Sequence, residues 1–169
     1  LKIFCYSTNI TDTTIANTYI PFLTYMFFHG GIIHLIGNMW YLWIFGDNVE
    51  DTLGHLKFIL FYLICGIGSA AVHVYFNKQS GVPCVGASGA IAGVLGAYMV
   101  TFPKARVLVI IPLFIVWQMA ELPAIIVLGF WFIIQFFSGA ASISAAQSGG
   151  VAWWAHIGGF VLGIILIKI

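Results

Sequence analysis

The feature that most constrains this chain is a series of five long apolar runs separated by short polar connections. The runs cover residues 22–45, 58–76, 85–102, 122–137 and 151–169, and every charged residue except Lys168 lies outside them. A helix that crosses a bilayer needs about 20 predominantly apolar residues. The pattern therefore predicts an all-α fold, a polytopic transmembrane helical bundle of five spans. We expect a single domain over residues 1–169, with residues 1–21 as a leading loop.

Composition excludes several other classes of protein. Only 7% of the residues are charged and the mean hydropathy is +1.06, whereas a water-soluble globular protein carries about 25% charged residues. The net charge of +1 comes without a basic block or stripe, so nucleic acid is not an expected partner. Three cysteines that lie far apart form neither a disulfide framework nor a metal-ligand motif. The lipid bilayer is the expected surrounding.

The connections between the runs differ in positive charge. If the spans alternate in direction, one side of the membrane carries Lys57, Lys104, Arg106 and Lys168, and the other carries Lys2 and Lys78. The positive-inside rule places the first group in the cytoplasm. The first, third and fifth runs then begin on the non-cytoplasmic side.

Two connections have unusual sequences. Residues 105–119 contain a β-branched stretch stopped by Pro112, and we expect an extended or interfacial segment there. Residues 138–150 are mostly small, and they predict a mobile loop on the non-cytoplasmic side.

Polar side chains inside apolar spans are costly, and they are functional candidates when they can meet a partner. The runs contain ten of interest, namely His29, His34, Asn38, Cys65, Ser69, His73, Ser88, Tyr98, Gln135 and His156. His34 and Asn38 are four residues apart and share one face of a helix. Ser88 and His156 each lie near the start of a run, so all four are expected at a similar depth near the non-cytoplasmic face.

Small residues surround Ser88 and His156 on their helices. Ser88 is followed by a face built from Gly89, Ala92, Gly93 and Gly96, and His156 shares a face with Gly159 and Gly163. Membrane helices approach each other closely through such faces. We therefore expect the helices over 85–102 and 151–169 to pack together, with the Ser88 hydroxyl and the His156 ring at their contact.

This set of side chains fits nucleophilic catalysis. A serine becomes a good nucleophile when an imidazole within hydrogen-bonding reach takes its proton, which assigns Ser88 as nucleophile and His156 as base. The Ser88 backbone N–H, the Asn38 amide and the His34 ring are candidate donors to the developing oxyanion. No acidic residue is expected on this side of the membrane in the spans, so the prediction is a dyad. The sequence has neither an HExxH motif for zinc nor an intramembrane aspartate pair.

Three ordered motifs resemble one family. HxxxN at 34–38, GASG at 86–89 and AHIGG at 155–159 are similar to the motifs of the rhomboid intramembrane serine proteases. The resemblance covers about residues 20–169, and the expected fold is rhomboid-like with the family's first span missing from this chain. It implies Ser88 as nucleophile, His156 as general base, and His34, Asn38 and the Ser88 amide as the oxyanion site. Helix packing around the site would involve Gly86, Gly89, Gly93, Gly159 and Gly163.

The resemblance also implies substrates and location. Single-span transmembrane proteins would be cleaved near the outer ends of their spans, the active site would open toward the non-cytoplasmic face, and no cofactor is expected. His29 is a possible accessory residue, more readily explained by a structural hydrogen bond than by catalysis. The residue four after the serine, often an aromatic that packs on the histidine in this family, is Ala92 here. We expect Trp153 or Trp154 to orient the base instead.

The sequence is also compatible with two other functions. One is a catalytically silent rhomboid-like protein that binds transmembrane helices. The other is a small channel or carrier, which is disfavoured because the polar residues lie near one side only. The oligomeric state and the natural substrate are not determined by the sequence.

Overall fold

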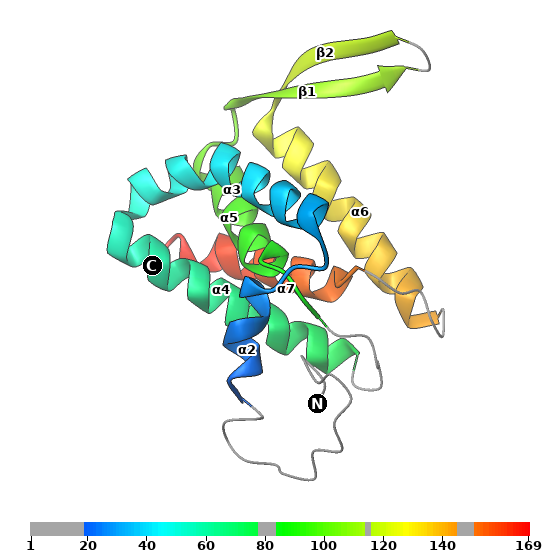
Figure 1. The fold of residues 1–169 in the computed structure, drawn as a ribbon. Coiled ribbons are helices and arrows are strands. Elements are labelled where there is room, and N and C mark those ends of the chain that lie inside the picture. The colour runs from blue at the N-terminus through cyan, green and yellow to red at the C-terminus, as the bar shows by residue number, and fades with distance from the viewer. Residues whose placement is uncertain (1–18, 78–83, 114–115, 145–150) are drawn as a thin grey trace.

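The computed structural model describes residues 19–77, 84–113, 116–144 and 151–169. In this part of the chain the elements follow the order α2 (Pro21–Thr24), η1 (Tyr25–Phe27), α3 (Ile32–Leu53), α4 (His55–Phe76), α5 (Ser88–Thr101), β1 (Arg106–Leu113), β2 (Val116–Pro123), α6 (Ala124–Ser144) and α7 (Trp153–Leu166). The fold is mostly helical, as predicted (Figure 1). The predicted leading loop falls largely on residues 1–18, outside the described residues.

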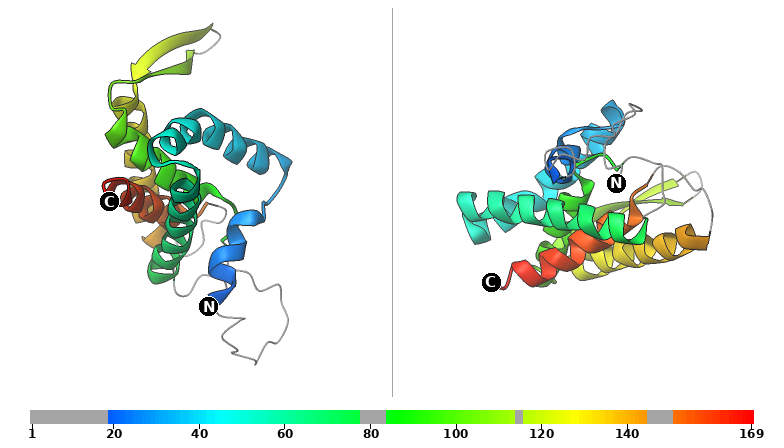
Figure 2. Two further views of the ribbon diagram at one scale, coloured as in Figure 1. Left: turned by 90° about the vertical axis from the view of Figure 1, so that its left-hand side faces the viewer. Right: turned by 90° about the horizontal axis from the view of Figure 1, so that it is seen from below.

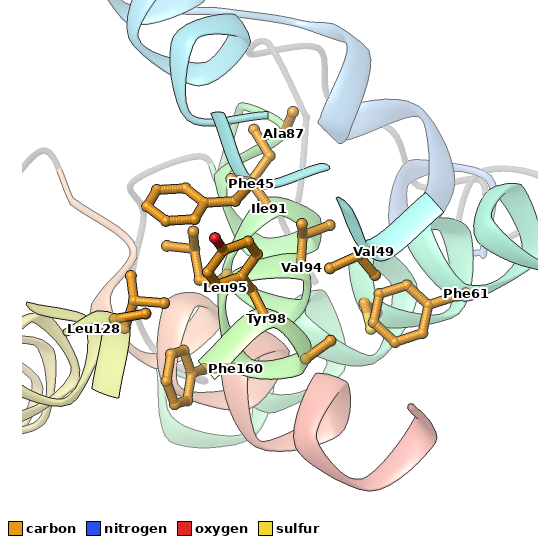
Figure 3. Close-up of a cluster of buried hydrophobic side chains, with 14 residues drawn as sticks. Phe45, Val49, Phe61, Ala87, Ile91, Val94, Leu95, Tyr98, Leu128 and Phe160 are labelled. Carbon is orange, nitrogen blue, oxygen red and sulfur yellow. The ribbon is translucent and has the colours of Figure 1, made fainter. Parts of the chain in front are cut away.

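α5 lies at the centre of the helices, with α3, α4 and α7 around it and α6 along one flank (Figures 1 and 2). Ten consecutive residues of α5, from Gly89 to Tyr98, are buried. Figure 3 shows its Ile91, Val94, Leu95 and Tyr98 side chains within a cluster drawn from all the surrounding helices. The other labelled members are Phe45 and Val49 of α3, Phe61 of α4, Ala87, Leu128 of α6 and Phe160 of α7.

Close contact between the backbones of α5 and α7 depends on the small residues that were expected to form this helix contact. A Cβ atom built at Gly159 would lie 1.9 Å from the Gly89 carbonyl oxygen, and one at Gly163 would lie 1.9 Å from that of Gly93. A Cβ at Gly96 would lie 2.1 Å from the Phe160 carbonyl oxygen. No side chain fits into these spaces, so the two helices pack at the short distance that small-residue faces allow.

Two of the described helices, His55–Phe76 and the Ala124–Ser142 part of α6, are both long and apolar enough to cross a membrane. α5 and α7 are shorter apolar helices of 14 residues each. Their outward faces also carry large apolar side chains, such as Val161 and Ile165 of α7. A surface of this kind is compatible with lipid.

The predicted helix over 22–45 is wrong at both ends. The chain forms α2 and η1, then leaves the helical conformation at Phe28 and resumes only at Ile32. Gly30 and Gly31 explain the break, because glycine favours extended and turn conformations over helix. At the other end the helix continues through the acidic residues to Leu53 and stops at Gly54, where φ is +79°.

The predicted all-α class also needs correction. The segment expected to be extended is extended, but it pairs as an antiparallel β1–β2 hairpin that runs to Pro123. The hairpin projects beyond the helices next to the start of α6 (Figures 1 and 2). At its base, the backbone N–H groups of Ala124 and Ile125 donate to the Ala105 and Pro103 carbonyls. These bonds join the end of α5 to the start of α6.

The expected mobile loop over 138–150 is helical in its first part. Residues 138–144 continue α6, because small residues such as alanine are compatible with a helix. The remainder, 145–150, lies outside the described residues. The other predicted helices, 58–76, 85–102 and 151–169, agree with α4, α5 and α7 to within three residues at each end.

Candidate active site

Ser88 is the first residue of α5. The preceding Gly86 has φ of +114°, a conformation that side-chain-bearing residues rarely adopt, and its N–H donates to the Tyr25 carbonyl over 3.0 Å. The first N–H groups of a helix have no acceptor within the helix, and they lie at the positive end of its dipole. The fold therefore presents the Ser88 hydroxyl beside free backbone donors.

His156 lies in the first turn of α7 and reaches Ser88. Its Nε2 atom is 2.8 Å from the Ser88 Oγ, across 68 residues of sequence. Both side chains are partly buried. The close α5–α7 packing through Gly159 and Gly89, described above, sets this distance because it brings the two helix starts together.

The other ring nitrogen of His156 bonds to α6. Nδ1 lies 2.7 Å from Oε1 of Gln135, whose side chain is 6% exposed. A carbonyl oxygen only accepts, so Nδ1 carries the proton and donates it to this bond. Nε2 is then unprotonated and accepts from the Ser88 hydroxyl. Sequence reasoning counted Gln135 among the polar residues of the spans but gave it no role.

Aromatic rings enclose the imidazole on two sides. The Trp131 ring of α6 lies 5.9 Å from the His156 ring between centroids, and the Trp153 ring lies edge-on at 6.4 Å. Of the two tryptophans expected to orient the base, Trp153 does contact it. Trp154 instead stacks on Phe76 of α4 with centroids 3.9 Å apart.

His34 and Asn38 face the turn that leads into Ser88. A Cβ atom at Gly86 would lie 2.9 Å from His34 Nε2 and 3.5 Å from Asn38 Nδ2. The Gly30 N–H donates to His34 Nδ1 over 3.3 Å, which leaves the proton of a neutral ring on Nε2, the atom nearer Gly86. Both side chains therefore present N–H donors at the start of α5.

Two buried polar atoms near this turn have no hydrogen-bond partner among the described residues, Asn38 Nδ2 and His29 Nε2. Asn38 is 7% exposed. His29 lies in the break before α3, with its ring 5.4 Å from that of His34. Buried donors are normally paired, so the Asn38 amide is available to an oxygen that enters the site.

Acidic and metal-binding groups are not part of the site as described. Asp47, Glu50 and Asp51 lie toward the C-terminal end of α3, and Glu121 lies on β2 beside Arg106. Within the described ranges no group of three or more His, Cys, Asp or Glu side chains could hold a metal ion. The described site thus consists of a hydroxyl, an imidazole, an amide acceptor and several N–H donors. Such a site can activate a nucleophile and stabilise an oxyanion.

The helices have apolar outer faces, and the Ser88–His156 pair lies at one end of the bundle. Residues 16–169 match the family model described as Rhomboid domain. The chain belongs to the rhomboid family, as the sequence motifs predicted, and it is a membrane protein of that family.

Several curated relatives support the same membership. The chain is 34% identical over 149 residues to "RHOMBOID-like protein 6, mitochondrial" of Arabidopsis thaliana, covering 86% of this chain and 43% of that protein. It is 30% identical over 145 residues to "Presenilin-associated rhomboid-like protein A, mitochondrial" of Danio rerio, covering 82% and 37%. The human presenilin-associated rhomboid-like protein is 33% identical over 144 residues, covering 82% and 38%. The matched region thus spans about two fifths of each relative.

Proposed function

We propose that this chain is an intramembrane serine endopeptidase that cleaves transmembrane segments of single-span membrane proteins. The observation that carries the proposal is the 2.8 Å contact between Ser88 Oγ and His156 Nε2, with the Nδ1 proton directed away from it toward Gln135. Rhomboid proteins usually are intramembrane serine proteases and act on transmembrane substrates in the bilayer. The family membership and the site geometry therefore favour the same chemistry.

The reaction follows from the positions of the protons. Ser88 Oγ attacks the scissile carbonyl carbon while Nε2 of His156 takes the hydroxyl proton. The carbonyl oxygen becomes an oxyanion, which the Ser88 N–H, the Asn38 amide and the His34 Nε2–H stabilise as donors. The C–N bond then breaks as the amine leaving group receives the proton from Nε2.

Water completes the cycle. The ester between Ser88 and the acyl part of the substrate is attacked by a water molecule, whose proton goes to Nε2 of His156. The new carboxylic acid leaves as the C–O bond to Ser88 breaks, and Oγ recovers its proton from Nε2. No cofactor takes part in this scheme, and no step needs an acidic side chain.

We place the site at the non-cytoplasmic end of a five-span bundle. Ser88, His34 and His156 all lie in the first turns of their helices, at the end where the Phe76 end of α4 also lies against α7. The hairpin, which begins at Arg106, and the nearby Lys104 lie at the start of α6, the end that the positive-inside rule assigns to the cytoplasm. A site at this depth would reach the outer part of a substrate helix.

The test is labelling of the purified protein by a fluorophosphonate, together with cleavage of a model single-span substrate in liposomes. We expect the parent to be labelled and to cleave, and Ser88→Ala and His156→Ala to do neither. Ser142→Ala is the matched control, because its hydroxyl donates to Gly139 within α6. A parent that binds the substrate but is neither labelled nor active would replace the protease with the alternative, a catalytically silent binder of transmembrane helices.

A further inference from the structure

Gln135 is a buried amide on a helix whose other described side chains are mainly apolar. The sequence from Ala124 to Phe137 contains no other amide or charged residue. A buried amide is costly unless it is hydrogen-bonded. Its Oε1 bonds to Nδ1 of His156 over 2.7 Å, so one of its polar atoms is satisfied by the imidazole itself.

We propose that Gln135 is the positioning residue that holds His156 in its catalytic tautomer, so that Ser88, His156 and Gln135 form one chain of hydrogen bonds. The proposal rests on the proposed protease function and deepens it. Histidine exists in two neutral tautomers, and the partner of one nitrogen decides which form is present. The Gln135 carbonyl accepts a hydrogen bond from the Nδ1–H group, so the proton stays on Nδ1. The lone pair then lies on Nε2, where it can accept the proton of the Ser88 hydroxyl.

A neutral acceptor suits this location. In soluble serine enzymes an aspartate fixes the tautomer of the histidine, but a carboxylate within a membrane-spanning helix is costly. The amide carbonyl supplies the same direction of hydrogen bond without a charge. The described site therefore lacks an acid and still has a group that orients the base.

α6 also contributes a second contact to the imidazole. Trp131 lies one helical turn before Gln135, on the same face, and its ring is 5.9 Å from that of His156. Phe132 stacks on Phe160 of α7 at 4.7 Å between centroids, which fixes α6 against α7 at this level. The orientation of the base consequently depends on how α6 is seated on α7.

Two other histidines lie near His156, and the Gln135 variants leave both of them unchanged. His34 of α3 and His73 of α4 are the neighbours that act on it electrostatically. Neither supplies a described acceptor to Nδ1, and both are retained when Gln135 is replaced. A difference between the parent and a Gln135 variant therefore reports on Gln135.

The experiment compares Gln135→Met, Gln135→Glu and the control Ile134→Met in liposomes. Methionine matches the shape of glutamine but lacks the carbonyl, and Ile134 is a 43% exposed neighbour on α6. We expect Gln135→Met to lower kcat about tenfold or more, the effect of one lost hydrogen bond in the transition state, with KM little changed. Ile134→Met should match the parent in kcat and KM.

Gln135→Glu keeps an acceptor oxygen, so it should recover activity relative to Gln135→Met. The new carboxylate would favour the imidazolium form, and the acid limb of the pH profile should move to higher pH. Nitrogen NMR of labelled histidine gives a readout that does not depend on turnover. We expect the Nδ1–H tautomer of His156 in the parent and a loss of that preference in Gln135→Met.

The proposal would be overturned if Gln135→Met had the same kcat as the parent and its His156 kept the same tautomer. If Gln135→Met does not fold, Gln135→Glu decides, and an acid limb that stays in place would overturn it. A parent that is never labelled by a fluorophosphonate would instead contradict the protease function. In that case the NMR tautomer would still test the contact with Gln135.

Discussion

Polar side chains within the helices fall into two groups that differ in their hydrogen bonds. The Tyr25 and Ser69 hydroxyl oxygens lie 2.7 Å apart, and each lies 2.8 Å from the Gly66 carbonyl oxygen, so that one hydroxyl can donate to the carbonyl and the other can donate to the first hydroxyl. This network is closed and buried beside α5. Asn38 is buried to a similar degree, yet its Nδ2 has no partner among the described residues. The first arrangement stabilises the fold, and the second leaves a donor without a described partner at the proposed oxyanion site.

Because the Asn38 amide has no partner in the described part of the chain, its removal should affect catalysis, whereas removal of the Ser69 hydroxyl should affect stability. Asn38→Ala should lower kcat by about 10²–10³, as the loss of one oxyanion donor does in other serine enzymes. Its unfolding temperature should change little, because no described hydrogen bond is lost. Ser69→Ala is the comparison, and we expect it to lose about 1 kcal/mol of stability with its buried bond. Detergent unfolding curves and liposome cleavage rates measure both. An Asn38→Ala variant that loses stability but keeps full kcat would make Asn38 structural.

The pH dependence of the reaction follows from the role of His156. The base must be neutral to accept the Ser88 proton, so activity should fall as pH falls and the imidazole becomes protonated. The rate of fluorophosphonate labelling, followed from pH 8 down to pH 3, measures this acid limb without a substrate. A flat profile with chemistry limiting would exclude His156 as the base.

At the scale of elements, the α5–α7 contact is the one on which the site depends most directly. We expect Gly163→Ala to destabilise the protein by about 1–3 kcal/mol, as overpacking does, because its Cβ would lie 1.9 Å from the Gly93 oxygen. Gly37→Ala is the matched control in α3, where a Cβ would meet nothing within 4 Å. That change should be neutral or slightly stabilising. Equal unfolding temperatures for the two variants would contradict the close packing.

The sequence predicted that α5 and α7 pack together, but it did not predict how α6 packs against α7. The small residues around Ser88 and His156 lie on single faces, so their packing could be inferred without knowing the other helices. Gln135 could not be placed, because which face of α6 meets α7 is decided by contacts such as that between Phe132 and Phe160. The hairpin was missed because no Asn-Gly or Asp-Gly dipeptide marks a reversal between residues 106 and 123.

The break before α3 shows a further limit of the sequence pattern. Residues 22–45 are predominantly apolar, so hydropathy alone does not separate α2 and η1 from α3. The separation matters for the site, because Tyr25 of η1 accepts from the Gly86 N–H while His34 of α3 faces the same glycine. η1 and α3 thus contact the same turn from two directions, an arrangement that depends on tertiary contact.

At the scale of the whole molecule, the candidate site residues lie at one end of the helices and the hairpin lies at the other end. The first turns of α3, α5 and α7 carry His34, Ser88 and His156, while the hairpin joins the other ends of α5 and α6. Five spans of alternating direction would put these ends on different sides of the bilayer. The site would then open to the non-cytoplasmic face and the hairpin to the cytoplasm.

Single cysteines test this topology, in a chain whose three native cysteines are replaced. In right-side-out vesicles, Val151→Cys near the site should react with a membrane-impermeant maleimide, since Val151 is 45% exposed. Gln118→Cys on β2 should react only after permeabilisation, and Lys168→Cys at the far end of α7 should behave like Gln118→Cys. Reaction of the Val151 and Gln118 positions from the same side would contradict the five-span arrangement. Reaction from opposite sides with the order reversed would keep the five spans and move the site to the cytoplasmic face.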